Sequence, residues 1–207
     1  PAAHASVLMP GSLPLWTSLL AMAVLHDKIT RARAVGLACI VLGDLLVGGA
    51  SLLKAFDGGD VWKGDLMFMS AAFCWACYSV MVRRYALDPV RATIAITAFS
   101  CVSFVPVYGL AAWMGWIPSH LHTAPLSEMV FQTFYQGLGS VVISGITFNV
   151  MIRYFGPVRS TMITALVPGL SALGAVLFLN EPMSINLLGG LLLVTCGILF
   201  GVRKPKT

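Results

Sequence analysis

The chain has 207 residues, of which 58% are hydrophobic and only 10% are charged, and its mean hydropathy is +0.88. A soluble domain carries about 45–50% apolar and about 25% charged residues, so this composition predicts a protein surrounded by lipid. The net charge of +5 does not indicate nucleic-acid binding, because the 13 Lys and Arg residues lie scattered between apolar runs without a basic motif.

Seven apolar runs are long enough to cross a bilayer, which takes about 20 helical residues. They cover residues 7–25, 34–53, 65–82, 92–114, 129–152, 158–179 and 185–202. Three of them contain a proline (Pro14, Pro106, Pro168), for which a kink or a close helix contact is the simplest interpretation. The sequence therefore predicts an all-α polytopic membrane helix bundle with seven transmembrane helices and no soluble domain.

The second run contains an acidic residue, Asp44, at its eleventh position of twenty. A carboxylate near the middle of a bilayer costs several kcal/mol unless it is buried, paired or protonated. We interpret Asp44 as a candidate proton or substrate site. Two alternatives remain open: a structural hydrogen bond to a neighbouring helix, or a partner on helices outside this chain.

The third run places Trp75 and Tyr78 three residues apart on one helix face, either as aromatics of a substrate cavity or as packing residues. The overlapping CWAC motif (74–77) has the spacing of a redox or zinc motif, but no second Cys or His pair lies nearby. We expect the cysteines to pack as small hydrophobic residues, namely Cys39, Cys74, Cys77, Cys101 and Cys196.

The fifth run is unusually polar for a membrane helix. At about 100° per residue, its polar and small residues fall within an arc of about 140°. They are Gln132, Gln136, Gly139, Ser140, Ser144 and Thr147. Such a stripe faces something other than lipid, so it predicts either the lining of a substrate cavity or an interhelical hydrogen-bond seam.

The loop charges predict the orientation of the chain. Counted over alternate loops, 11 Lys and Arg residues fall on one side and two, Lys54 and Lys63, on the other. The larger set comprises Lys28, Arg31, Arg33, Arg83, Arg84, Arg91, Arg153, Arg159, Arg203, Lys204 and Lys206. The positive-inside rule then places the C-terminus in the cytoplasm. No signal-peptide pattern precedes the first run, and the start at Pro1 predicts that the chain begins within a longer protein.

No residue pattern indicates catalysis, a metal site or a cofactor. The histidines lie near predicted membrane boundaries without the spacing of metal ligands or of a nucleophile and its base (His4, His26, His120, His122). A G-x-x-x-x-G-K nucleotide loop is absent from the sequence, so any pumping must draw on a gradient. We expect no enzyme activity and, as partners, the lipid bilayer and a small-molecule substrate, with a homodimer left open.

The sequence matches itself at an offset of 154 residues. Five landmarks coincide in this register: Pro14 with Pro168, Asp27 with Glu181, Thr30 with Ser184, Gly36 with Gly190, and Gly43 with Gly197. In each copy an acidic residue ends one helix, a hydroxyl residue three positions later is a candidate N-cap, and glycines seven apart share a face of the next helix. Glu181 is thus interpreted as a helix-boundary carboxylate rather than an ion ligand, with Pro182 reversing the chain.

The two matched loops differ in charge. The first carries Lys28, Arg31 and Arg33, whereas the second, NEPMSIN (180–186), carries no Lys or Arg. The charge difference predicts that they lie on opposite sides of the membrane. An odd number of helices per repeat produces this inversion, and inverted repeats are typical of secondary transporters.

The segment LVPGLSALGAVLFLNEPMSINLLGGLLLVTCGILFGV (166–202) resembles the end of an EamA domain of the drug/metabolite transporter superfamily. The resemblance implies that residues 1–53 hold the last two helices of a first repeat, 54–63 the inter-repeat loop, 64–202 a complete five-helix second repeat and 203–207 a basic tail. The first copy departs from the pattern, because His26-Asp27 stands where Glu is usual.

The resemblance further implies a ten-helix protein of five plus five helices. The offset would start the first repeat at 64 − 154 = −90, so about 90 residues, the length of three helices with loops, would precede this chain. It also implies a secondary-active transporter of small metabolites or drug-like compounds in a bacterial inner membrane, with alternating access between the repeats. The alternative is a non-transporting membrane scaffold or accessory subunit.

Overall fold

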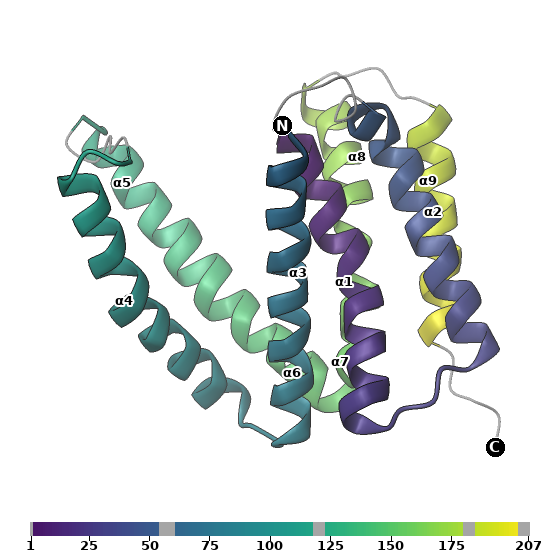
Figure 1. The fold of residues 1–207 in the computed structure, drawn as a ribbon. Coiled ribbons are helices and arrows are strands. Elements are labelled where there is room, and N and C mark those ends of the chain that lie inside the picture. The colour runs from purple at the N-terminus through teal and green to yellow at the C-terminus, as the bar shows by residue number, and fades with distance from the viewer. Residues whose placement is uncertain (1, 54–60, 118–122, 180–184, 203–207) are drawn as a thin grey trace. The chain divides into compact units, whose positions relative to one another are not determined.

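The computed structural model describes residues 2–53, 61–117, 123–179 and 185–202, and every regular element within those ranges is a helix (Figure 1). The all-α prediction is confirmed for this part of the chain. In order, the elements are α1 (Ala2–Leu25), α2 (Arg31–Leu53), α3 (Val61–Arg84), α4 (Pro89–Trp113), α5 (Leu126–Gln132), the π-helix η2 (Thr133–Ser144), α6 (Gly145–Phe155), α7 (Pro157–Thr164), α8 (Val167–Leu179) and α9 (Ile185–Val202).

Within the described residues, four helical stretches are long and apolar enough to cross a membrane. They are Trp62–Arg84, Pro89–Trp113, Leu126–Phe155 and Pro157–Phe178, and two shorter apolar helices cover Met9–Leu25 and Leu188–Val202. Each of the seven predicted runs is mainly helical in the part that the structure describes. That all seven cross the bilayer stays a prediction.

Two of the predicted runs are not single α-helices. The run 129–152 changes from α5 into the π-helix η2 and back into α6, so the α-helical geometry expected for its centre is wrong. The run 158–179 divides into α7 and α8 just before Pro168. There the N–H groups of Ala165 and Leu166 each donate to the carbonyl three residues earlier, which tightens the last turn of α7. Pro168 has no N–H to donate to the carbonyl four residues earlier, that of Thr164, and its ring crowds this carbonyl, which explains the division.

The chain separates into two compact units, residues 1–84 with 155–207 and residues 85–154, and each is described by itself. In the first unit α1 packs against α2, α3 and α7, and α2 packs along α9. The core combines small and branched side chains from five helices: Ala21, Leu37, Ile40, Val80, Val158, Met162, Ala165 and Val194. Along α1 and α3, Trp16 meets Phe73 edge to face, with ring centroids 5.4 Å apart.

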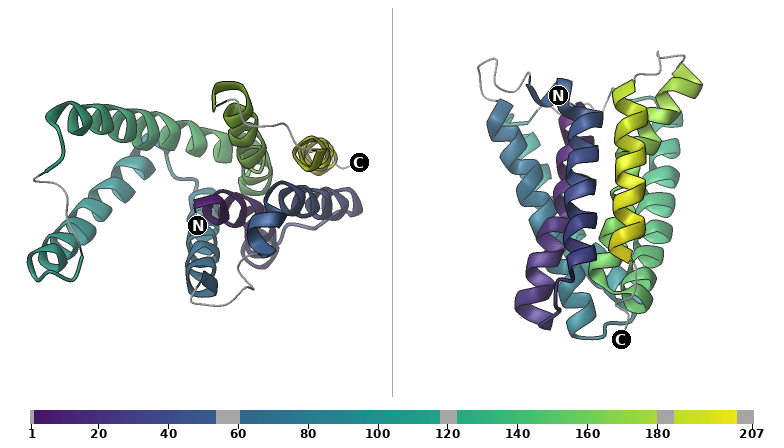
Figure 2. Two further views of the ribbon diagram at one scale, coloured as in Figure 1. Left: turned by 90° about the horizontal axis from the view of Figure 1, so that it is seen from above. Right: turned by 90° about the vertical axis from the view of Figure 1, so that its right-hand side faces the viewer.

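The helices α2 and α9 run side by side in opposite directions (Figures 1 and 2). A Cβ atom placed on Gly36 would lie 2.6 Å from the carbonyl oxygen of Gly197, and one placed on Gly43 would lie 2.8 Å from that of Gly190. These contacts leave no room for a side chain. Close backbone approach of this kind is typical of helix pairs in membranes, where small residues let the helices pack. We call the four residues the glycine seam.

The loop between α1 and α2 contains the predicted N-cap residue Thr30. His26 has a φ of 57°, and the N–H of Asp27 donates to the carbonyl of Ala21, so the chain turns back over the last turn of α1 and satisfies one of its free carbonyl groups. The hydroxyl of Thr30 accepts from the N–H of Arg33, so Thr30 is the N-cap of α2. The corresponding residues Glu181, Pro182 and Ser184 lie outside the described residues.

The second unit contains α4, α5, η2 and α6. Asp88 caps α4 by accepting from the N–H groups of Val90 and Arg91. The side-chain amide of Asn149 on α6 donates to the Thr93 hydroxyl at 3.0 Å, and that hydroxyl donates to the carbonyl of Pro89. Both side chains are buried, so this chain of hydrogen bonds ties the start of α4 to α6.

Candidate functional site

Asp44 is the most deeply buried acidic residue among those the structure describes, with 3% of its surface exposed. Neither of its carboxylate oxygens has a hydrogen-bond partner in the described part of the chain. The alternative that Asp44 makes a structural hydrogen bond to a neighbouring helix therefore has no support among the described residues. An unpaired buried carboxylate lowers stability, and such residues in membrane proteins are usually retained for function.

The carboxylate of Asp44 lies against a glycine of α1. A Cβ atom on Gly11 would lie 2.7 Å from Oδ2 and 3.2 Å from Cβ of Asp44, so a side chain at this position would displace the carboxylate. The sequence did not single out Gly11, because one glycine in an apolar helix carries no pattern. The sequence marks this position only indirectly, because Pro10 and Pro14 flank Gly11 and prolines are unusual within a helix.

The predicted polar stripe belongs to the second unit and spans α5, η2 and α6. Its side chains at Gln132, Gln136, Ser140, Ser144 and Thr147 are exposed, so nothing within that unit buries them. A π-helix, with i→i+5 hydrogen bonds, advances about 80° per residue. Residues four apart are then separated by nearly a full turn, so Gln132, Gln136, Ser140 and Ser144 stay on one face of the helix. Gly139 and Thr147 fall outside that face. The choice between a cavity and a hydrogen-bond seam stays open.

Trp75 and Tyr78 share a face of α3, as predicted from their spacing. Their ring centroids are 5.7 Å apart with an angle of 49° between the ring planes. Trp75 is 36% exposed and Tyr78 is half-buried, so the pair is within reach of a neighbour on that side of the helix. A role in a substrate cavity remains a prediction.

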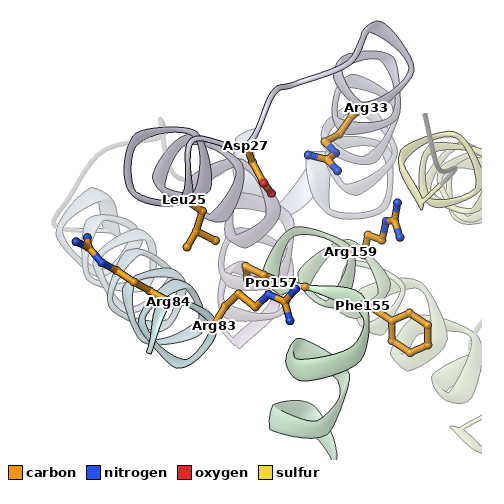
Figure 3. Close-up of a pocket in the computed structure, with 9 residues that line it drawn as sticks. Leu25, Asp27, Arg33, Arg83, Arg84, Phe155, Pro157 and Arg159 are labelled. Atoms are coloured by element: carbon orange, nitrogen blue, oxygen red, sulfur yellow. The ribbon is translucent and has the colours of Figure 1, made fainter. Parts of the chain in front are cut away.

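A cavity of about 460 Å³ lies in the first unit at the ends of α1, α2, α3 and α7, beside Phe155, the last residue of α6 (Figure 3). It is lined by Leu25, Asp27, Arg33, Arg83, Arg84, Phe155, Gly156, Pro157 and Arg159. Four arginines against one aspartate give this lining a formal charge of +3. The sequence indicated these arginines only as loop charges, because their convergence depends on how α1, α2, α3 and α7 pack.

All five cysteines are free thiols, and the described residues contain no group of three or more His, Cys, Asp or Glu that could hold a metal ion. Cys39 and Cys77 are half-buried, while Cys74, Cys101 and Cys196 are exposed on apolar helices. The CWAC cysteines are therefore not joined to each other.

Comparisons with known proteins identify relatives among membrane transporters, in agreement with the long apolar helices. The model of the EamA-like transporter family matches residues 62–203. The chain is 25% identical to the uncharacterized transporter YyaM of Bacillus subtilis over 96% of this chain and 65% of that protein. It is 23% identical to the probable amino-acid metabolite efflux pump of Salmonella typhimurium over 100% of this chain and 70% of the pump.

A second Bacillus subtilis protein, the uncharacterized transporter YoaV, is 25% identical over 90% of this chain and 62% of its own length. The chain thus spans about two thirds of the length of the curated relatives it matches. The family and the long apolar helices identify an integral membrane protein. This chain belongs to the EamA-like transporter family.

Proposed function

We propose that the protein containing this chain is a secondary-active transporter of small metabolites or drug-like compounds, working by alternating access between two inverted repeats. In this proposal the whole protein has ten transmembrane helices. Helices α1 and α2 end the first repeat, and the segment from α3 to α9 forms the second. The match of the family to residues 62–203 supports this division, because it covers the segment assigned to the second repeat.

The glycine seam carries the proposal. Gly36 and Gly190 are repeat mates, as are Gly43 and Gly197, yet in space Gly36 meets Gly197 and Gly43 meets Gly190. Gly36 therefore packs against the residue that corresponds to Gly43, and Gly43 packs against the residue that corresponds to Gly36. A two-fold axis between antiparallel helices produces this reciprocal pattern, and such an axis in the membrane plane relates the inverted repeats of transporters.

Asp44 is the proposed site of coupling. It follows Gly43 directly, near the middle of α2, and its carboxylate is buried without a partner among the described residues. A carboxylate in this position can bind a proton in one state of the carrier and release it in another. Proton release would then accompany substrate movement, which would couple transport to the proton gradient.

The name of one relative suggests the first substrates to test. The Salmonella relative is named for amino-acid metabolite efflux, so amino acids and their derivatives are the first compounds to test. The polar residues of η2 and the Trp75–Tyr78 pair supply hydrogen-bonding and aromatic groups that suit an amphiphilic molecule of this kind.

Transport by the full-length protein in proteoliposomes tests the proposal. We expect accumulation of at least one compound from a panel of amino acids, amino-acid derivatives and lipophilic cations when a proton gradient is imposed. Accumulation should stop when an ionophore dissipates the gradient. A folded, correctly inserted protein that moves none of these compounds under any gradient would favour the scaffold or accessory subunit instead.

A further inference from the structure

The basic cavity of the first unit is not used by the proposed transport cycle. It is bordered by the C-terminal ends of α1 and α3 and by the N-terminal ends of α2 and α7. Two stretches apolar enough to cross a membrane, Trp62–Arg84 and Pro157–Phe178, end or begin at this point. The ends of such helices lie at the level of lipid headgroups, so the cavity is placed where phosphate groups are concentrated.

The charged side chains that line the cavity come from separate helices. Arg33 belongs to α2, Arg83 to α3 and Arg159 to α7, and Asp27 lies in the loop after α1. In Figure 3 Asp27, Arg33 and Arg83 point inward, whereas Arg84 extends away from the others and Arg159 lies at the rim with its guanidinium group turned outward. Arg33 and Arg159 are each half-buried, and the guanidinium group of Arg33 donates to the carbonyl of Lys28 at 3.5 Å. Guanidinium groups bind phosphate oxygens in pairs of hydrogen bonds.

The backbone adds a second attraction for an anion. Gly156, which lines the cavity, precedes α7 with a φ of 82°, and Pro157 occupies the first position of the helix. No side chain caps this helix start. The N-terminus of a helix presents N–H groups and the positive end of the helix dipole, and phosphate groups bind there in many proteins.

From these observations we propose that the cavity binds a phosphate group, held by Arg33, Arg159 and Arg83 at the N-terminus of α7. A headgroup of an anionic phospholipid and a free phosphate ion share this chemistry. The cavity volume of about 460 Å³ accommodates either of them. Asp27 is the one carboxylate in the lining, and it opposes the binding of an anion.

Binding can be measured without any transport assay. The purified full-length protein in detergent is titrated with short-chain phosphatidylglycerol, short-chain phosphatidylcholine and inorganic phosphate. Bound lipid is counted by native mass spectrometry, and phosphate binding is followed by calorimetry. Phosphatidylglycerol should bind more tightly than phosphatidylcholine. If inorganic phosphate competes with it the site accepts both sources, and if phosphate does not bind the headgroup is the ligand.

Two double variants with the same change in charge locate the site. Arg33→Gln with Arg159→Gln should weaken anion binding about 10- to 30-fold, because each guanidinium near the membrane surface contributes separately. Arg31→Gln with Arg91→Gln removes two exposed arginines outside the cavity and should leave binding nearly unchanged. Asp27→Asn should strengthen binding, since it removes the opposing charge.

Thermal unfolding of each variant separates a lost site from a lost fold. The gain expected for Asp27→Asn cannot result from misfolding, so it keeps the test informative if the arginine variants are unstable. Equal binding by the two double variants would overturn the proposal, as would the failure of both phosphatidylglycerol and inorganic phosphate to bind the unchanged protein.

Discussion

Gly43 and Asp44 are neighbours in α2, but they pack against different helices and relate differently to the proposed repeat. Gly43 faces α9, and its mate Gly197 lies in the same seam. Asp44 faces Gly11 of α1, and its mate Ile198 is a partly buried apolar residue packed on the core. The seam needs the same small residue twice because both helices must approach closely. The carboxylate has no such duplicate, which is expected when one repeat has acquired a functional group that the fold does not require.

The glycine seam should give the largest effects on stability. Gly36→Leu and Gly197→Leu each force a side chain into backbone atoms that would lie 2.6 Å from a Cβ, so both should destabilise the protein by about 3 kcal/mol or more. The two losses should be similar because the contacts are reciprocal. Gly109→Leu on α4 is the control, since nothing lies within 4 Å of a Cβ there. Yield of monodisperse protein and thermal unfolding measure the effect; a stable Gly36→Leu protein would contradict the seam.

Gly11→Ala tests the other contact of α2. The added methyl group meets Oδ2 of Asp44, and the collision should outweigh the better helix propensity of alanine, for a net loss of about 1–2 kcal/mol. Gly174→Ala, with open space around its Cβ, should be neutral or slightly stabilising. Replacing the carboxylate by the smaller hydroxyl group in Asp44→Ser should restore much of the stability lost by Gly11→Ala. Thermal unfolding of Gly11→Ala, Asp44→Ser, the double variant and the control Gly174→Ala measures this coupling. Additive losses of stability in the double variant would show that Gly11 and Asp44 are not in contact.

Gln136→Leu distinguishes the two interpretations of the polar stripe. The side chain is exposed in its unit, so its replacement should change stability by less than about 1 kcal/mol. If the stripe lines the substrate cavity, transport should fall about fivefold or more through the loss of one hydrogen bond. Phe134→Leu, an exposed residue off the stripe, should leave transport unchanged. Loss of folded Gln136→Leu protein would instead support the hydrogen-bond seam.

Cysteine labelling tests the predicted orientation without disturbing the fold. In a background free of the five native cysteines, Tyr85→Cys beside Arg83 and Arg84 should react only with reagents that reach the cytoplasm. Thr123→Cys in the loop after α4 should react from outside the cell. The reverse pattern would contradict the charge distribution.

Local signals in the sequence predicted the helices well. The apolar runs located all seven helical segments, and the Thr30 cap follows from a hydroxyl residue placed just before a helix. The π-helix at Thr133–Ser144 was missed, because a change from i→i+4 to i→i+5 hydrogen bonds carries no composition signal that distinguishes it from an α-helix. The division before Pro168 was only indicated as a kink.

Contacts between distant residues were the hardest part to predict. The repeat named the four seam glycines, but it did not show which would meet. The Gly11–Asp44 contact and the arginine cavity join residues from separate helices, so no spacing along the chain reveals them. Asn149 was visible as an amide in an apolar run, and its bond to Thr93, 56 residues away, was not.

The role of Asp44 is tested most directly by proton-driven transport in proteoliposomes. Asp44→Asn keeps the size of the side chain but cannot release a proton, and Asp44→Leu keeps its branching. Both proteins should fold, because neither carboxylate oxygen has a hydrogen-bond partner among the described residues, and both should lose gradient-driven transport by about 100-fold or more. Glu128→Gln, which removes an exposed carboxylate at the start of α5, should transport normally. A stable Asp44→Leu carrier with full activity would contradict the account and leave the polar stripe as the remaining candidate site.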